Sequence, residues 1–176
     1  MAKAHLVRES KSMTATSGPG LSLMSELIGL AGMMETPVVI VDVQRAGPST
    51  GMPTKEGQGD LNMATHGVHG EVPRVVLAPK TVSGCFERTI QAVNIAHEFH
   101  IPVLLLSSQS LSHRMQTITP PDPGTIPIYE EPLFDGTAGM GEEFQRFHPT
   151  PDGRPSPRSI PGIPGDGHQA GEHARR

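Results

Sequence analysis

Cysteine, aromatic residues and clustered positive charge are all scarce in this sequence of 176 residues. The single cysteine, Cys85, excludes an internal disulfide, and it cannot by itself hold an iron–sulfur cluster, which needs about four thiolates. The net charge is -4 and no block of Lys or Arg occurs, so the positive surface of a nucleic-acid-binding protein is missing. Nucleic acid is therefore excluded as a predicted partner.

Long apolar runs are also absent. No stretch reaches the roughly 18 apolar residues of a membrane span. The first residues, MAKAHLVRESKS, contain no apolar signal core. We therefore predict no membrane association and a cytoplasmic location.

Glycine and proline, in contrast, are abundant, with 20 and 18 residues. Eleven of the 18 prolines follow Leu111, where apolar periodicity also ends. We predict an α/β domain over residues 1–112. For residues 113–176 two alternatives stay open: a disordered tail, or an extended arm that becomes ordered on a partner's surface.

Four β-branched runs in the first 112 residues predict strands. Two of them, over 38–43 and 101–108, are almost continuously apolar, as in parallel strands covered on both faces. Shorter strands are predicted over 12–17 and 73–79. The run over 38–43 contains one charged residue, Asp42, and is expected to be central.

Helical periodicity separates these strands. One helix is predicted to begin near Gly20 and to end before Pro37, with apolar residues on more than one side. A short helix is predicted over 59–67. A third is predicted over 81–100, with Thr81 as N-cap and with one buried face made of Val82, Phe86, Val93, Ala96 and Phe99. Alternating strands and helices predict a parallel sheet with right-handed crossovers.

Three loops follow three of the predicted strands, at residues 17–20, 45–54 and 107–110. The carboxyl ends of parallel strands meet at one edge, where open α/β sheets bind ligands. Arg45 presents a planar fork suited to a carboxylate, and Thr50 and Thr54 can donate hydroxyl hydrogen bonds to the same anion. Two plainer alternatives remain open: Arg45 forms a surface salt bridge, and the 17–20 loop only starts a helix.

Histidine and cysteine give weaker signals. His66 and His69 lie near Glu71, and the pair His97 and His100 lies at a predicted helix end. Neither pair has a third ligand at zinc-like spacing, so we predict no metal site. Cys85 is expected to be an inert core residue. The Gly165–Gly167 segment, which imitates a diphosphate-metal motif, is interpreted as a turn.

Four motifs occur in order between about Met13 and His173: TATSGPGLSLMSE, VVIVDVQRAGPSTGMPTKEGQGDL, HGEVPRVVLAP, and IPGIPG with GEH. Together they resemble the alpha subunit of 2-oxoacid:ferredoxin oxidoreductases, particularly the 2-oxoglutarate type. The resemblance implies a partial pyrimidine-binding domain of a thiamine diphosphate enzyme. This is an α/β fold with a parallel sheet flanked by helices, followed by an extended Pro/Gly-rich tail that leads to a further domain.

The same resemblance implies a reaction and its partners. The reaction is oxidative decarboxylation of 2-oxoglutarate, or a related 2-oxoacid, to an acyl-CoA, with ferredoxin as electron acceptor. Thiamine diphosphate would be shared with a beta subunit that carries magnesium and an iron–sulfur cluster. Coenzyme A and ferredoxin would act through the complex.

Site residues follow by position in these motifs. Arg45 is similar to the arginine that grips the substrate carboxylate, and Thr54 to the second polar contact. Ser49 and Thr50, in the Pro48–Gly51 turn, would help to shape the substrate cavity. The cofactor side of the cavity would be shaped by a loop of four residues: Ser17, Gly18, Pro19 and Gly20.

Two departures from the family pattern shape the functional prediction. Nothing before Met13 resembles the family's Tyr-Pro-Ile-Thr-Pro motif or the glutamate that activates the aminopyrimidine, and the chain stops at Arg176. We therefore expect a partial alpha subunit that is inactive alone. The alternatives are a non-catalytic remnant that only associates with partner subunits, and an unrelated small α/β anion-binding protein.

Overall fold

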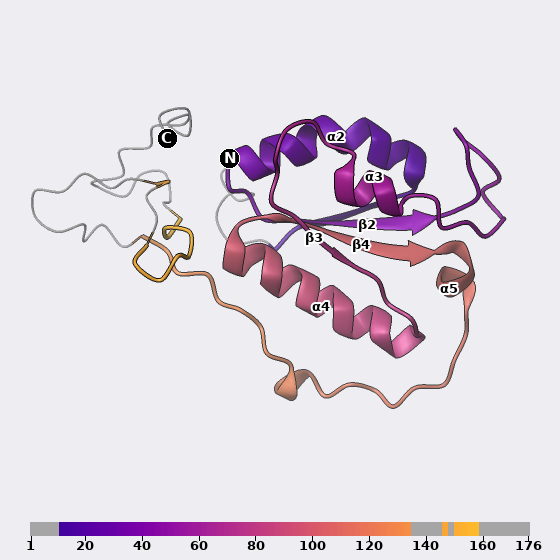
Figure 1. Cartoon of the computed structure of the whole chain (residues 1–176). Helices are drawn as coiled ribbons and strands as arrows, with labels where there is room; N and C mark the ends of the chain where they lie inside the picture. Colours follow the sequence, from indigo (N-terminus) through magenta and orange to yellow (C-terminus); the bar gives the residue numbers. More distant parts are fainter. Residues whose placement is uncertain (1–10, 135–145, 148–149, 159–176) are drawn as a thin grey trace, which may run out of the picture.

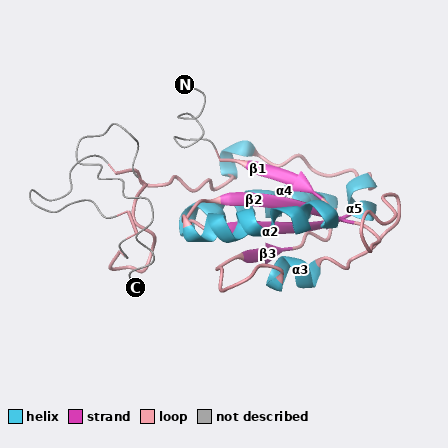
Figure 2. Cartoon of the chain, turned by 90° about the horizontal axis from the view of Figure 1, so that it is seen from above, coloured by secondary structure: helices cyan, strands magenta, loops and turns pink. Residues whose placement is uncertain are grey.

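The computed structural model describes residues 11–134, 146–147 and 150–158. Four parallel strands form one sheet in the order β1-β2-β4-β3. Their bounds are β1 Met13–Thr16, β2 Val38–Gln44, β3 Val75–Leu77 and β4 Pro102–Ser108. Seen from above, β1 and β3 lie at opposite edges (Figure 2). The predicted parallel sheet and the central place of the 38–43 run are confirmed.

The two central strands carry the core because their side chains are apolar on both faces. β2 and β4 pair in register from Val38 with Pro102 to Gln44 with Ser108. The side chains of Val39 and Val103 face one layer of helix, and those of Ile40 and Leu104 face the other. This burial on both faces is what the continuous apolar runs predicted.

One face of the sheet is covered by α2 (Gly18–Met33) and α3 (Leu61–His66), as Figure 1 shows. Leu21 and Ile28 of α2 pack with Ala64 of α3 and with Ile40 of β2. Gly32 lies so close to Val72 that a Cβ there would be 2.6 Å from Val72 Cγ1. The close neighbour that requires glycine at this position of α2 is therefore a side chain and not a backbone.

The opposite face is covered by α4 (Val82–Phe99) (Figure 1). Thr81 is its N-cap, as predicted, because its Oγ1 accepts a hydrogen bond from the Gly84 backbone N–H at 3.0 Å. Ala92 and Ala96 are fully buried against Val39 and Val103. Small alanines at the contact let the helix lie close to the sheet.

Two burial predictions were wrong. α2 is not buried on more than one side, since Leu23 is 85% exposed and Leu27 is 61% exposed. On α4 the predicted Ala96 is buried, together with Ala92, but the predicted Phe86 and Phe99 are 40% and 46% exposed. In both helices the large apolar residues outnumber the positions that the sheet can cover.

After β4 the chain forms the short helix α5 (Gln109–His113) and then runs extended beneath α4, interrupted by η1 (Pro123–Thr125) (Figure 1). Asn94 of α4 fixes this run twice, because its side-chain amide donates to the Pro127 carbonyl at 2.7 Å and its Oδ1 accepts from the Tyr129 N–H at 2.9 Å. The run over 114–134 therefore has specific contacts with the α/β layer.

A buried ionic cluster lies at the amino ends of β2 and β4. Glu131 contacts His97 Nδ1 at 2.9 Å, His100 Nε2 at 2.8 Å and Arg158 Nε at 3.3 Å. Burial alone would raise the pKa of Glu131, but hydrogen bonds from His100 and His97 and the charge of Arg158 lower it to about 2. This cluster joins the extended run to the carboxyl end of α4.

Arg146 extends the same cluster. It is 8% exposed, and its Nη1 donates to Glu35 Oε2 at 2.9 Å.

Within the described residues no helix combines the length and hydrophobicity that a bilayer crossing needs. The Gly165–Gly167 segment and the IPGIPG and GEH motifs lie outside the described residues.

Candidate functional site

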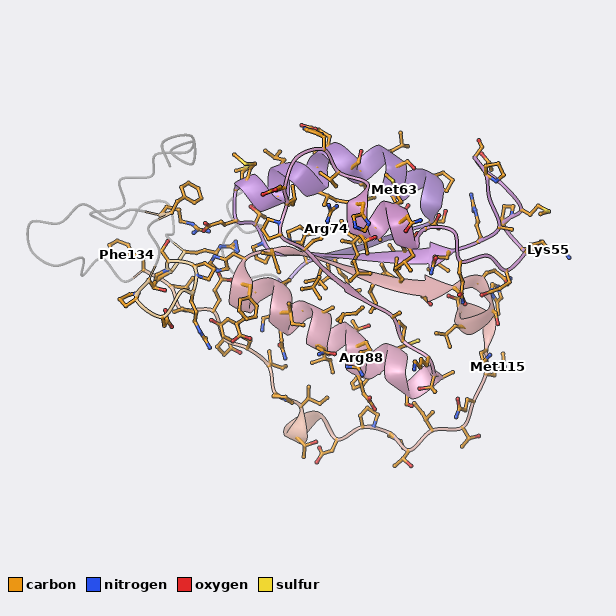
Figure 3. The ribbon with its side chains drawn as sticks, viewed as in Figure 1. Lys55, Met63, Arg74, Arg88, Met115 and Phe134 are labelled. Atoms are coloured by element: carbon orange, nitrogen blue, oxygen red, sulfur yellow. The ribbon has the colours of Figure 1, made fainter. Side chains whose placement is uncertain are left out.

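The three predicted loops follow the carboxyl ends of β1, β2 and β4. These three strands are adjacent and parallel, so the loops meet at one edge of the sheet. Figure 3 shows Lys55, in the loop after β2, at the opposite end of the molecule from Phe134. The edge where the three loops meet and the ionic cluster are therefore at opposite ends of the strands.

Gln44, the last residue of β2, connects two of these loops. It is buried, its Nε2 donates to the Ser107 carbonyl at 3.3 Å, and its Oε1 accepts from the Asp60 N–H at 3.3 Å. A further bond runs from the Ser110 N–H to Glu56 Oε2 at 2.7 Å. The loop after β2 and the end of β4 are thus held together by side chains.

Asp60 connects the 17–20 loop to the loop after β2 and to the end of β4. A Cβ at Gly18 would lie 2.7 Å from Asp60 Oδ1, so the Asp60 carboxyl group packs directly on the glycine that begins α2. Only glycine leaves room for this contact. Asp60 therefore lies under the 17–20 turn and next to Gln44.

The loop after β2 folds back on itself. The Ala46 N–H donates to the Lys55 carbonyl at 3.0 Å, and the Met52 N–H donates to the Ala46 carbonyl at 2.9 Å. Gly51 has φ of 61, and a Cβ there would collide with the Ala46 carbonyl oxygen. These bonds form a neck that brings Thr54 and Lys55 back beside the end of β2.

Arg45 is positioned at the base of this neck. It is half-buried, and its Nε is enclosed without a hydrogen-bond partner among the described residues. The surface salt bridge that was the plainer alternative is not among the ion pairs of the described part of the chain. A buried N–H without a partner is costly, and an anion would satisfy it.

The other predicted substrate contacts are exposed. Ser49 and Thr50 lie at the tip of the loop, and Thr54 lies in its neck next to the Ala46–Lys55 bond. Their side chains are open to solvent, so a ligand could reach them. The structure places Arg45 and Thr54 at the same base and the two tip residues farther along the loop.

The predicted cofactor residues form the turn between β1 and α2. Ser17 is the N-cap of α2, but its side chain makes no capping bond, while its carbonyl accepts from the Gly20 and Leu21 N–H groups. Pro19 occupies the first helical turn, where proline is favoured. A Cβ at Gly20 would collide with Thr16 Oγ1. The turn thus has an uncommitted hydroxyl and two glycines required by close packing.

Asp42 is the feature that the sequence reasoning left without a role. It is 0% exposed, and neither side-chain oxygen has a hydrogen-bond donor among the described residues. Burial, reinforced by the neighbouring Asp60, raises the pKa of Asp42 to about 7. Its one sequence signal was a lone carboxylate in a continuous β-branched run.

The histidines and Cys85 have structural surroundings. His97 and His100 contact Glu131, and His69 lies 3.9 Å from Glu26 at the surface. In the described ranges, no group of three or more His, Cys, Asp or Glu residues is arranged to hold a metal ion. Cys85 is half-buried, and burial raises the pKa of its thiol, which disfavours the reactive thiolate.

Comparison with known proteins decides the family. Residues 10–150 match the family described as pyruvate flavodoxin/ferredoxin oxidoreductase, thiamine diphosphate-binding (POR_N). The chain belongs to this family. The POR_N match covers all four strands and their loops, so the resemblance drawn from the motifs is confirmed, and an unrelated α/β anion-binding protein is excluded.

Individual relatives agree. The chain is 43% identical over 159 residues to 2-oxoglutarate oxidoreductase subunit KorA of Mycobacterium tuberculosis, covering 90% of this chain and 24% of the relative. It is 51% identical over 112 residues to 2-oxoglutarate synthase subunit KorA of Methanothermobacter marburgensis, covering 64% and 30%. The chain therefore spans less than a third of the length of these two relatives.

A solved structure also matches the fold. The 2-oxoglutarate:ferredoxin oxidoreductase from Magnetococcus marinus, solved with 2-oxoglutarate, coenzyme A and succinyl-CoA bound, superimposes with a TM-score of 0.85 at 44% identity. The match covers 97% of this chain and 30% of that chain. The predicted α/β fold is thus confirmed as a POR_N fold.

The residues at the loop-lined edge fit the polar groups that a POR_N domain would hold. The unpaired Arg45 Nε requires an acceptor, and the Ser17 hydroxyl is free of a capping bond. Both lie at the carboxyl edge, on neighbouring loops. A carboxylate near Arg45 and a polar cofactor edge near Ser17 would supply the partners that the chain itself does not.

Proposed function

We propose that this chain is the substrate-binding part of the alpha subunit of a 2-oxoglutarate:ferredoxin oxidoreductase. The observation that carries the proposal is the Arg45 Nε, enclosed and unpaired at the edge where the three loops meet. A guanidinium in that position favours a planar carboxylate, because two parallel N–H groups match its two oxygens. Membership of the POR_N family supports the reaction class.

Each loop has a role in this proposal. Arg45 and Thr54 bind the carboxylate of the 2-oxoacid, while Ser49 and Thr50 border the substrate from the loop tip. Ser17, Gly18, Pro19 and Gly20 border thiamine diphosphate, which supplies the carbon nucleophile and electron sink for decarboxylation when bound. The protein's contribution is to orient the substrate and to balance its charge.

Partner subunits complete the enzyme in this proposal. A beta subunit supplies magnesium and the iron–sulfur cluster, ferredoxin accepts the electrons and coenzyme A accepts the acyl group. Cys85 alone could not hold a cluster, which supports placing it on a partner. We expect the isolated chain to show no turnover of 2-oxoglutarate with thiamine diphosphate, and carbon dioxide release by the chain alone would contradict this.

Binding of 2-oxoglutarate to the isolated chain, measured by calorimetry, tests the substrate site. Arg45→Ala should weaken binding roughly tenfold to a hundredfold, because a hydrogen bond to a charged group contributes about 1.5–3 kcal/mol. Arg88→Ala is the matched control, since Arg88 is exposed on α4, away from the three loops, and its side chain bonds to Gln91 of the same helix (Figure 3). Equal affinities for the two variants would remove Arg45 from the site.

A second candidate function is a chain that only associates with partner subunits. It is favoured by the outer face of α2, where Leu23 and Leu27 are exposed, and by the adjoining apolar groove of about 340 Å³ between α2 and the β1 side of the sheet. The double variant Leu23→Gln, Leu27→Gln should reduce association, measured by sedimentation. Association through this face without Arg45-dependent binding of 2-oxoglutarate would favour this candidate over the first.

A further inference from the structure

Asp42 and Asp60 form a pair of carboxyl groups beneath the crevice. Asp42 points from β2 toward α2 and α3, on the same face as Ile40 and Gln44, and Asp60 immediately precedes α3. Both Asp42 oxygens and Asp60 Oδ2 are enclosed without a hydrogen-bond donor among the described residues. As two carboxylates, this pair would bury like charges with nothing to balance them.

A single proton resolves the conflict. When one carboxyl group is protonated, its O–H donates to the other, and the enclosed oxygens gain a partner. A hydrogen bond with the Asp60 side chain is among the causes that raise the pKa of Asp42. Among the described residues no lysine or arginine acts on Asp42: the residues registered with it are Thr16 on β1 and Leu106 on β4, and Asp60 is the charged group that acts on it from the helical layer.

The surroundings indicate which residue holds the proton. Asp60 packs on Gly18, at the amino end of the 16-residue helix α2, where the helix dipole favours negative charge. Asp42 lies inside the sheet layer with 0% exposure, where burial disfavours its charge. The negative charge therefore belongs on Asp60 and the proton on Asp42.

We propose that Asp42 is a protonated positioning residue that donates its O–H to Asp60 and so holds the Asp60 carboxylate against the 17–20 turn. The Asp60 backbone N–H in turn donates to Gln44 Oε1, and Gln44 Nε2 donates to the Ser107 carbonyl. A single proton on Asp42 thus holds in place the contacts of Asp60, Gln44 and Ser107 that lie beneath all three loops. The inference rests on the proposed function only where it concerns the cofactor side of the crevice.

Carbon-13 NMR of the full 176-residue chain tests this without any ligand. The Asp42 carboxyl carbon should titrate near pH 7, well above the ordinary value of 3.8, and the Gly18 and Gly20 amide signals should move with the same midpoint. In Asp42→Asn the amide still donates to Asp60, so the two glycine signals should keep their low-pH positions from pH 5 to 8. Asp122→Asn, at an exposed turn, is the control and should leave the titration unchanged.

The outcomes are distinct from those of the substrate test. An Asp42 midpoint below pH 5, or a glycine titration near pH 7 that persists in Asp42→Asn, would overturn the proposal even if Arg45 binds 2-oxoglutarate. Asp42→Val, which has no donor, should displace the Gly18 and Gly20 signals at every pH. If that variant does not fold, the comparison of wild type with Asp42→Asn still decides.

Discussion

At the amino end of the strands the buried charges are paired, whereas at the carboxyl end several are not. Glu131 contacts two histidines and Arg158, and Arg146 contacts Glu35. At the other end, Asp42 and the Arg45 Nε have no donor or acceptor among the described residues. Ion-paired clusters favour one structure, while enclosed charged groups without an ion partner at a loop-lined edge mark where a ligand or a proton is needed.

Removing Glu131 should produce the largest effect. Glu131→Gln leaves His97 and His100 buried, and Arg158 half-buried, without a carboxylate. Breaking a buried ion pair from one side costs about 3–5 kcal/mol. We expect a loss of this size in the free energy of unfolding, measured by urea titration, together with faster proteolysis within 114–134. Glu130→Gln is the matched control, because Glu130 is the exposed neighbour. A loss no greater than in that control would show that the cluster is not structural.

The pH dependence of the free energy of unfolding should distinguish the buried groups at the two ends of the strands. The folded pKa of Glu131 is lowered from 4.5 to about 2, so its contribution is present above pH 4.5 and is lost as the pH falls toward 2. The folded pKa of Asp42 is raised from 3.8 to about 7, so the folded chain retains a proton in this range and stability falls as the pH rises from about 4 to 7. The two groups therefore give slopes of opposite sign.

Denaturant unfolding between pH 2 and pH 8 would measure both slopes. One proton limits each to about 1.4 kcal/mol per pH unit. Asp42→Asn should flatten the decline between pH 4 and 7 and keep the acid limb, whereas Glu131→Gln should do the reverse. A decline of unchanged slope in Asp42→Asn would place the titrating group elsewhere.

The smallest stability effect is expected at Arg45. Because its Nε has no partner among the described residues, Arg45→Ala should change the free energy of unfolding by no more than about 0.5 kcal/mol while weakening 2-oxoglutarate binding. Urea titration measures the free energy of unfolding, and calorimetry on the same protein measures 2-oxoglutarate binding. A destabilisation of several kcal/mol would mean that Arg45 belongs with the structural charges.

Much of the fold could be predicted from the sequence because periodicity and caps are local signals. The strands over 38–43 and 101–108 lie within one residue of their observed bounds at each end, and Thr81 caps α4 as expected. The buried face of α4 was predicted correctly at Ala96 but wrongly at Phe86 and Phe99, because side-chain size favoured the two phenylalanines, whereas the sheet contacts the small Ala92 and Ala96. Local pattern does not reveal how closely two layers approach.

The site was predictable in part for a similar reason. Strand ends and motif resemblance identified Arg45, whose role remains a prediction. They missed Asp60, Gln44 and Asp42, because these act through contacts between loops distant in the sequence. The contact of Glu131 with His97 spans 34 residues and had no sequence signal. The one usable sequence signal was a lone polar residue inside an apolar strand, as at Asp42.

The neck of the loop after β2 has a consequence for how such a site can diversify. The bonds from Ala46 to Met52 and Lys55 close the loop on its own backbone, so residues 47–53 place no side chain in either core cluster. Substitutions at the tip can therefore change the side chains that the loop presents without unfolding the sheet. If Arg45 binds the substrate carboxylate as proposed, the residues at the tip can vary while Arg45, below the neck, keeps its place.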